Sequence, residues 1–353
     1  MSELLSRPAY GKRDDLVLLD ELNRLTAHHA TWCEPYGSLL GATPLPATRI
    51  ESVPYIHVGL FKQLNMVTRA PEAKIVRSVL SSSTSGTSSR ITLDEFSTSL
   101  QSASVEAILR SFIGAEKRPL LILDSAASLR RRDDFSARIM AALSLKPFAT
   151  EIFFLLKDAA DPASFNFAQL ECALKQSDDL LVYGFSWMLW LGWAQQAFPD
   201  FLRAELSRKR IHFIHSGGWK KLDDIRVQRE KFDAHLIGTA AADSIVVDYY
   251  GLVEQMGIIY PLCAYGVRHV PVWADVLVRD SWTGEVLETG EGQLQLLNAI
   301  TYGTPCHSVL TEDMGRLLSG TCRCGREGKG FELIGRVPKA EIRGCSNVGL
   351  RVL

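Results

Sequence analysis

The sequence predicts an α/β fold of stacked sheets flanked by helices, with a smaller β-rich subdomain. Short apolar runs typical of buried strands alternate with longer segments of helical periodicity between residues 75 and 249. The chain has 353 residues, 46% of them hydrophobic and 22% charged, which suits one large domain or a pair. From about Gly257 onward, strands and turns replace this alternation. We therefore expect three regions, at 1–256, 257–336 and 337–353, the last a hinge-like tail.

The first predicted element is an amphipathic helix at 14–33, where leucines recur on or near one face. A later helix is expected to begin at Thr92, because Thr92 and Glu95 have the spacing of a capping box. The predicted strands are 75–80, 120–123, 152–156, 180–183, 211–214, 244–249, 270–278 and 293–297. The other predicted helices are 137–143, 167–175, 187–198 and 222–232, and the helix at Thr92 extends to 112.

Charge and cysteine content limit the class of protein. The formal net charge is -1, so no overall field favours nucleic acid or an anionic membrane surface. The first ten residues lack the apolar segment of a secretory signal, and the seven cysteines are an odd number. We therefore expect a cytoplasmic protein whose cysteines are thiols or metal ligands. The uncharged stretch 180–198 contains glycine and glutamine, which favours a strand and a Trp-rich helix over a membrane span.

A loop rich in serine and threonine, Ser-Ser-Ser-Thr-Ser-Gly-Thr-Ser-Ser-Arg at 81–90, follows one predicted strand and precedes a predicted helix. Small residues let backbone N–H groups approach phosphate oxygens, and hydroxyl groups add further donors. The loop is not a standard P-loop, because no Gly-Lys-Ser/Thr closes it. A surface loop or a phosphorylation site is the alternative. The phosphate-binding candidates are Ser85, Gly86, Thr87, Ser88 and Arg90.

Further motifs follow this loop in the order found in adenylate-forming enzymes, which the chain resembles. They are His-Ser-Gly-Gly-Trp-Lys-Lys at 215–221, Tyr-Gly-Leu-Val-Glu at 250–254, Thr-Gly-Glu to Gln-Leu at 283–294, Thr-Glu-Asp at 311–313, and Gly-Arg-Val-Pro-Lys at 335–339. The closer resemblance is to LuxE-type acyl-protein synthetases and phenylacetate-CoA ligases. It rests on 215–221, 250–260, 269–271, 322–326 and 337–345. The fold expected from it is the large N-terminal domain of adenylate-forming enzymes, without their usual C-terminal domain.

This resemblance implies that the chain activates a carboxylic acid, expected to be a fatty acid, with ATP and Mg²⁺ to form an acyl-adenylate. Glu254 would help to hold Mg²⁺, Asp313 would bind the ribose hydroxyls, and Arg336 would contact phosphate or ribose. For Glu254 and Asp313 the alternative is an exposed carboxylate in a loop. The residues expected around adenine and the α-phosphate are Gly217, Gly218, Trp219, Tyr250 and Gly251.

The sequence departs from the superfamily pattern in several places. Arg90 stands where a lysine is usual, and Val253 stands where a threonine is usual. The C-terminal domain that supplies a catalytic lysine is not expected here, so another cation is needed. The candidates are Lys220, Lys221 and Lys339.

Two groups of cysteines carry further expectations. Cys345 lies in a tail, where LuxE-type proteins carry the acyl group on a cysteine, and the alternative is an incidental cysteine. Cys263, His269, Cys322 and Cys324 have the residue types of a closed tetrahedral zinc site. The alternative is four unrelated groups in the β-rich region.

The expected reaction is transfer of the activated acyl group to Cys345 and then to a partner, such as an acyl reductase or a carrier protein. One alternative is a CoA or carrier-protein ligase for an aryl acid. Another is a non-catalytic nucleotide-binding subunit. The aromatic stretch 183–193 suits the wall of an acyl pocket, and it suits a plain hydrophobic core equally well.

Overall fold

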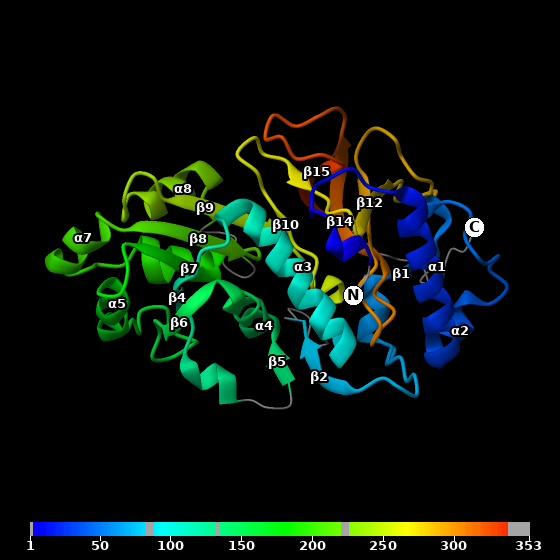
Figure 1. Cartoon of the computed structure of the whole chain (residues 1–353), viewed down its shortest axis with the longest axis horizontal. Coiled ribbons are helices and arrows are strands. Elements are labelled where there is room, and N and C mark those ends of the chain that lie inside the picture. Colours follow the sequence, from blue (N-terminus) through cyan, green and yellow to red (C-terminus); the bar gives the residue numbers. More distant parts are fainter. Residues whose placement is uncertain (1–2, 82–87, 131–133, 220–225, 338–353) are drawn as a thin grey trace. The chain divides into compact units, whose positions relative to one another are not determined.

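The computed structural model describes residues 3–81, 88–130, 134–219 and 226–337. It divides the chain into two compact units, which are described separately (Figure 1). Unit 1 contains residues up to Ile108 together with those from Leu252 onward, and unit 2 runs from Leu109 to Gly251. The expected functional division into 1–256, 257–336 and 337–353 remains a prediction.

Unit 2 contains a parallel sheet in the order β9-β8-β7-β4-β6. Its strands read as continuous apolar runs because both faces are covered. The aromatic residues Trp193 and Phe213 belong to the hydrophobic core of this unit. The strands are β4 (Arg118–Ile122), β5 (Asp134–Ser136), β6 (Ala149–Phe154), β7 (Asp179–Phe185), β8 (Arg210–Ser216) and β9 (Ile245–Tyr250). The helices are η4 (Ala126–Arg130), α4 (Ala137–Leu143), η5 (Lys146–Phe148), α5 (Phe167–Leu174), α6 (Ser186–Leu189), η6 (Trp190–Ala194), α7 (Asp200–Leu206) and α8 (Arg229–Ile237).

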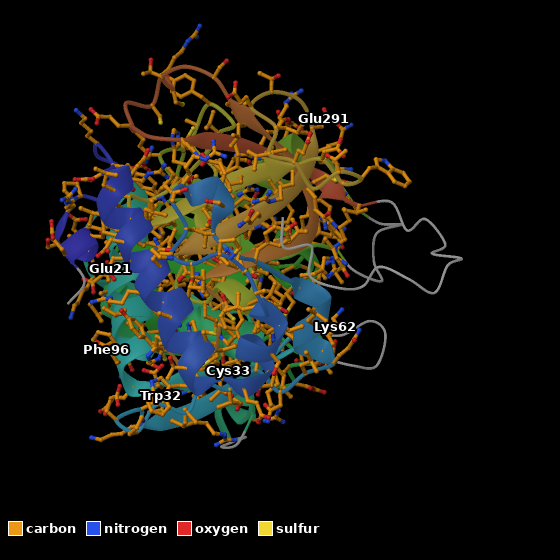
Figure 2. All side chains as sticks on the ribbon, turned by 90° about the vertical axis from the view of Figure 1, so that its right-hand side faces the viewer. Glu21, Trp32, Cys33, Lys62, Phe96 and Glu291 are labelled. Carbon is orange, nitrogen blue, oxygen red and sulfur yellow. The ribbon has the colours of Figure 1, made fainter. Side chains whose placement is uncertain are left out.

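Unit 1 is built on an antiparallel sheet in the order β11-β15-β14-β13-β12, with β1 added in parallel to β14. Figure 2 shows Glu21 and Trp32 on the long helix α1, and Lys62 at the end of the short helix η3. The strands are β1 (Ile56–His57), β2 (Ile75–Leu80), β3 (Arg90–Asp94), β10 (Tyr260–Pro261), β11 (Arg268–His269), β12 (Ala274–Arg279), β13 (Gly292–Asn298), β14 (Ser308–Leu318) and β15 (Gly330–Arg336). The helices are η1 (Glu3–Ser6), α1 (Asp15–Trp32), α2 (Glu34–Leu40), η2 (Ile50–Ser52), η3 (Val58–Lys62), α3 (Glu95–Ile113), which ends in unit 2, and η8 (Val253–Gln255).

Several predicted elements are confirmed. Strand β2 and helix α4 have the predicted bounds, and α1 is capped by Asp14, whose side chain accepts the N–H groups of Leu16 and Val17. The predicted parallel strands all occur, with their ends shifted by one to three residues. The α/β fold class is therefore confirmed. Within the described residues, no helix combines the length and the apolar character needed to span a membrane.

The predicted helix start at Thr92 is wrong. Residues 90–94 form β3, which pairs with β2, and α3 begins only at Glu95. Asp94, and not Thr92, caps the helix, because its carboxylate accepts both the backbone N–H (2.8 Å) and the hydroxyl (2.5 Å) of Ser97. Larger differences occur at other bounds: the strand predicted from 270 begins at Ala274, the Trp-rich helix ends at Ala194, and α8 spans Arg229–Ile237.

Candidate functional site

The Gly-Gly turn lies at the carboxyl end of β8, in unit 2. Gly217 has a φ of 80°, a left-handed conformation that favours glycine, and a Cβ at Gly218 would meet no atom within 4 Å. The Ser186 hydroxyl fixes the turn, since it lies 2.7 Å from the carbonyl oxygen of Gly217 and 2.9 Å from His215 Nδ1. Trp219 is 8% exposed and packs edge-on against Trp190. The turn therefore offers open backbone at Gly218 beside a buried aromatic side chain.

Tyr250 ends the neighbouring strand β9. Strands β8 and β9 are parallel, and Ser216 pairs with Tyr249. Gly217 and Tyr250 consequently leave the sheet at the same edge, the carboxyl edge where α/β sheets bind ligands. Gly251 follows directly. Unit 2 thus brings together the five residues expected around adenine and the α-phosphate.

The serine-rich loop connects different secondary-structure elements from those expected. It joins two antiparallel strands, β2 and β3, and not a strand and a helix. Its base is closed by the Ser81 N–H, which donates to the Ser89 carbonyl (3.0 Å), and by the Ser89 N–H, which donates to the Ser81 hydroxyl (2.8 Å). Ser88 and Arg90 lie at this base. Ser85, Gly86 and Thr87 lie outside the described residues, as do Lys220, Lys221, Lys339 and Cys345.

Glu254 is a buried carboxylate in unit 1, with 5% of its surface exposed. Burial raises the pKa of Glu254, while the nearby Ser89 hydroxyl and the Lys62 ammonium group act against this rise. The carboxylate of Asp313 adds to it. Burying a carboxylate is costly unless a positive charge or hydrogen bonds compensate. Glu254 is thus not the exposed loop carboxylate of the alternative interpretation, and it has the burial expected of a cation-binding group.

Asp313 and Arg336 lie opposite each other on β14 and β15. Arg336 Nε lies 3.7 Å from Asp313 Oδ1, and the side chains are 80% and 14% exposed respectively. The Asp313 backbone N–H donates to the Thr311 hydroxyl at 3.1 Å. The ribose-binding candidate and the candidate that contacts phosphate are therefore neighbours on one hairpin.

The four residues expected to bind zinc come together in unit 1. Their ligand atoms all lie within 4.8 Å of one another. Cys263 Sγ is 3.7 Å from Cys322 Sγ, and Cys324 Sγ is 3.1 Å from His269 Nε2. Ligands about 2.3 Å from a tetrahedral zinc lie about 3.8 Å apart, so the sulfur–sulfur distance fits such a site. Four protein ligands would leave no open position, which is typical of structural zinc.

The electrostatics of this cluster also suit a metal. Burial and the nearby Arg326 lower the pKa of His269 to about 4, so its imidazole is neutral at pH 7, as a ligand must be. Burial would raise the pKa of Cys324, but the backbone N–H and side chain of Arg326 lower it overall and favour the thiolate. Among the described residues, no hydrogen-bond partner reaches His269 Nδ1, and the Tyr10 ring packs edge-on against this imidazole.

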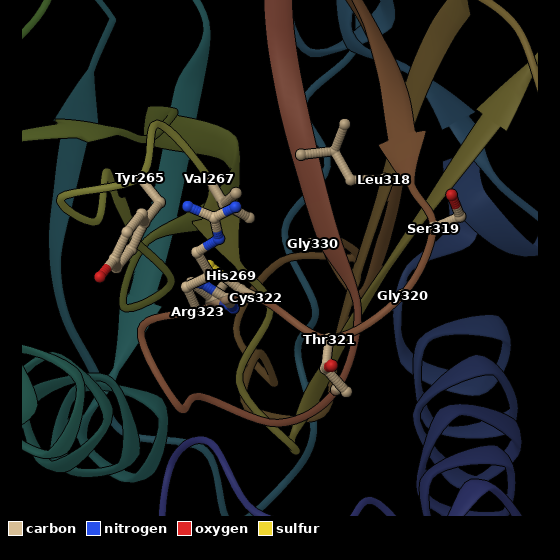
Figure 3. A pocket seen from close by; sticks show the side chains of 11 residues that line it. Tyr265, Val267, His269, Leu318, Ser319, Gly320, Thr321, Cys322, Arg323 and Gly330 are labelled. Atoms are coloured by element: carbon tan, nitrogen blue, oxygen red, sulfur yellow. The ribbon is translucent and has the colours of Figure 1, made fainter.

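A hollow of about 390 Å³ opens beside this cluster. In Figure 3, His269 and Cys322 lie near its centre, with Tyr265 on one side and Leu318 on the other. Its wall is formed by the loop between β14 and β15 and by the turn before β11. The pocket therefore belongs to the cysteine-rich loop, and none of its lining residues is an ATP-site candidate.

The aromatic stretch after β7 belongs to the hydrophobic core of unit 2. Trp193 is fully buried, and its indole N–H donates to the Thr239 hydroxyl at 2.9 Å. Trp190 stacks on Phe232 with ring centroids 6.0 Å apart. The core interpretation therefore applies to both tryptophans, and the position of the acyl pocket remains a prediction.

Sequence reasoning missed two residues around Glu254. Gln255 is fully buried, and its amide donates to the Cys306 carbonyl at 2.6 Å and accepts from Asn298 at 3.0 Å. These bonds hold η8 against β13. Lys62, on η3, is the cation that acts on the Glu254 carboxylate. No motif marks either residue, although a glutamine beside a motif glutamate is a weak signal.

Comparisons with solved structures identify the fold. A 2-hydroxyisobutyryl-CoA ligase in an open conformation, in complex with 2-HIB-AMP and CoA, superposes with a TM-score of 0.68 at 14% identity, covering 92% of this chain and 75% of that one. The same ligase in its postadenylation state gives 0.66 at 15% identity, with 92% and 68% covered. The amide bond synthetase McbA from Marinactinospora thermotolerans gives 0.50 at 17% identity, with 84% and 55% covered. These are similarities of fold, that of the N-terminal domain of adenylate-forming enzymes.

Sequence comparison identifies the family. No curated protein matches the chain. The model of the family described as "Acyl-protein synthetase, LuxE" matches residues 17–351, almost the whole sequence. The chain therefore belongs to the LuxE family of acyl-protein synthetases and is an acid–thiol ligase that forms an acyl-adenylate.

Proposed function

We propose that this chain activates a fatty acid with ATP and transfers the acyl group to a protein thiol, first to its own Cys345. A carboxylate oxygen attacks the α-phosphorus of ATP, the bond to the β-phosphate breaks, and pyrophosphate leaves. The thiolate then attacks the acyl carbon of the mixed anhydride, and AMP leaves. The match to the acyl-protein synthetase family over residues 17–351 carries this proposal.

Two buried or strand-held carboxylates have distinct roles in this proposal. Glu254, buried beside the base of the serine-rich loop, would help to hold Mg²⁺, which screens the repulsion between phosphates. Asp313, held on β14, would accept hydrogen bonds from the ribose hydroxyls, and Arg336 opposite it would contact phosphate or ribose. In unit 2, the turn at Gly217 and Gly218 would accept the adenine beside Trp219 and Tyr250.

The first half-reaction is tested by exchange of labelled pyrophosphate into ATP, with alkyl acids of increasing length and with aryl acids. We expect exchange that depends on Mg²⁺ and is fastest with a long-chain alkyl acid. Fastest exchange with an aryl acid would instead identify an aryl-acid ligase. No exchange with any acid would leave only the interpretation as a non-catalytic nucleotide-binding subunit.

The second half-reaction is tested by trapping the acyl group on the protein. Incubation with labelled acid and ATP should give a label that hydroxylamine releases, as expected for a thioester. Cys345→Ala should abolish this label while pyrophosphate exchange continues. Cys172→Ala is the matched control, since Cys172 is an exposed thiol on α5. A label that survives Cys345→Ala, or transfer to free CoA alone, would contradict self-acylation.

We also propose that Cys263, His269, Cys322 and Cys324 hold one structural zinc ion. The support is the 3.7 Å separation of two sulfur atoms and the grouping of four ligand atoms within 4.8 Å. The ion would join the turn after β10 to the loop between β14 and β15. It would take no part in either half-reaction, because a closed ligand shell has no place for substrate.

Elemental analysis of the purified protein tests the zinc proposal. We expect one zinc per chain in the native protein and in Cys172→Ala, and none in Cys322→Ser. The Cys322→Ser variant should be cut by protease between β14 and β15 before it is cut elsewhere. Native protein without zinc, which gains none when zinc is added, would refute the site.

A further inference from the structure

A short helix in unit 1 brings a lysine to the region of the ATP-site candidates. Strand β1 pairs in parallel with β14, with Ile56 opposite Val309 and His57 opposite Leu310. Helix η3 follows β1 without a break and ends at Lys62. Because Asp313 lies three residues beyond Leu310 on β14, the helix begins close to the strand that carries the ribose candidate.

The same helix lies against a strand that flanks the serine-rich loop. Helix η3 contacts both β14 and β3, and β3 begins at Arg90, where that loop ends. Lys62 is half-buried at the end of η3 (Figure 2). Its ammonium group acts on the buried Glu254 carboxylate and on the half-buried His57 imidazole. Lys62 thus acts on the same buried carboxylate, Glu254, on which the Ser89 hydroxyl and the Asp313 carboxylate also act.

Two other basic groups near this point, His57 and Arg336, are less suited than Lys62 to bind phosphate from a buried position. No hydrogen bond or ion pair joins Lys62 to another residue in the part of the chain that the structure describes. His57 is an unsuitable alternative, because burial lowers the pKa of its imidazole and keeps it neutral at pH 7. Arg336 is 80% exposed and lies 3.7 Å from Asp313. A half-buried lysine beside a buried carboxylate is suited to an anionic ligand that also carries a metal ion.

We propose that Lys62 is a catalytic residue of the adenylation step, and that its ammonium group contacts the phosphates of ATP. This inference rests on the proposed function above. It assigns to Lys62 the role for which Lys220, Lys221 and Lys339 were the candidates from sequence. As the bond between the α-phosphorus and the β-phosphate oxygen breaks, negative charge grows on the departing pyrophosphate. Lys62 stabilises that charge by electrostatic attraction, and the step transfers no proton.

The two half-reactions separate this role from a structural one. Lys62→Ala should lower the rate of acid-dependent pyrophosphate exchange by about 100-fold, the usual effect of losing one group that stabilises a transition state. The KM for the acid should stay the same. Lys62→Arg keeps the charge and should recover part of the rate. Transfer of the acyl group from chemically prepared acyl-adenylate to the protein thiol should be unchanged, because that step has no phosphate bond to break.

Lys74→Ala is the matched control. Lys74 is also a lysine of unit 1, but its side chain is 80% exposed and forms a surface ion pair with Glu95, 3.5 Å away. This variant should exchange pyrophosphate at the wild-type rate. Wild-type exchange in Lys62→Ala would overturn the inference, as would equal loss of both half-reactions. If the wild-type protein itself shows no exchange with any acid, the proposed function fails, and the role of Lys62 fails with it.

Discussion

Acidification should destabilise unit 1 through a pair of buried histidines. His307 is fully buried before β14 and stacks on His29 of α1, with ring centroids 5.1 Å apart. His307 Nε2 lies 3.0 Å from the Thr26 hydroxyl and 3.4 Å from the Tyr36 hydroxyl. Burial, with a smaller effect of His28, lowers the pKa of His307 to about 3. The pKa of His29 is also lowered, by burial, His307 and His28.

The direction and size of the effect follow from proton binding. In the unfolded chain a histidine has a pKa of about 6.5 and takes up a proton as the pH falls below that value. In the folded protein His307 stays neutral until about pH 3. The stability that it contributes is therefore present above pH 6.5 and is lost progressively as the pH falls toward 3. Between pH 7 and pH 5 His307 alone lowers the free energy of unfolding by about 2 kcal/mol, and His29 lowers it further.

Hydrogen exchange of the α1 peptide, measured by mass spectrometry at pH 7 and pH 5, reports the local free energy of opening. Values must first be corrected for the intrinsic pH dependence of exchange. His307→Gln keeps a group that can hydrogen-bond Thr26 but cannot take up a proton. It should be less stable than wild type at pH 7, yet lose about 2 kcal/mol less between pH 7 and pH 5. Equal losses in the two proteins would refute the assignment.

Three further outcomes are expected. Glu254→Gln should lower the rate of pyrophosphate exchange by about 100-fold. The midpoint of thermal unfolding should stay the same or rise, because the amide has no charge to desolvate. A fall in both the exchange rate and the midpoint would indicate a structural carboxylate. Gly315→Ala places a Cβ 2.6 Å from a backbone oxygen of β15. This clash should raise the KM for ATP and lower the free energy of unfolding by about 1–3 kcal/mol. Gly335→Ala is the control, because a Cβ there meets open space and should change neither quantity. Trp193→Ala, in the core of unit 2, should lower the free energy of unfolding by about 3–5 kcal/mol, measured by urea unfolding followed by fluorescence. A decrease of less than about 1 kcal/mol would contradict the burial of this side chain.

The parallel sheet of unit 2 was predictable because its strands are covered on both faces. A strand of that kind must be apolar throughout, so segments such as 180–183 and 211–214 stand out from their neighbours in the sequence. Their exact ends were not predictable, since polar residues at strand ends are held by pairing with neighbouring strands. Asp179, for example, lies opposite Arg210 in the register of β7 and β8, and its carboxylate accepts a hydrogen bond from Arg118 on β4.

The error at Thr92 has a non-local cause. The local pattern of a threonine followed by Glu95 is that of a helix start. In the structure the Thr92 N–H donates to the Thr304 hydroxyl at 3.0 Å, and that hydroxyl donates back to the Thr92 carbonyl at 2.9 Å. Thr304 lies 212 residues further along the chain. Together with pairing to Ser78 on β2, these contacts make residue 92 part of a strand, and no window of local sequence contains the bonds to Thr304.

The candidate site was predictable to the extent that its chemistry needs rare residue types. Cysteine and histidine are few, so Cys263 and Cys322 could be grouped although they are 59 residues apart. Lysine is common on protein surfaces, so Lys62 could not be distinguished by type. Its position depends on the pairing of β1 with β14, which joins segments about 250 residues apart. Residues that act through placement, and not through a motif, are therefore the ones that sequence reasoning misses.

The β14–β15 hairpin links the two chemical regions of unit 1. Leu318 pairs with Gly330 beside the cysteine-rich loop, and Asp313 pairs with Arg336 at the other end. Lys329, next to Gly330, holds the loop independently of any metal through Asp275, which is fully buried and 2.9 Å away. A zinc ion would therefore fix the turn of the hairpin, while six register pairs maintain the alignment between that turn and the ribose candidate. Because this alignment has its own hydrogen bonds, loss of the metal should affect stability more than the adenylation rate.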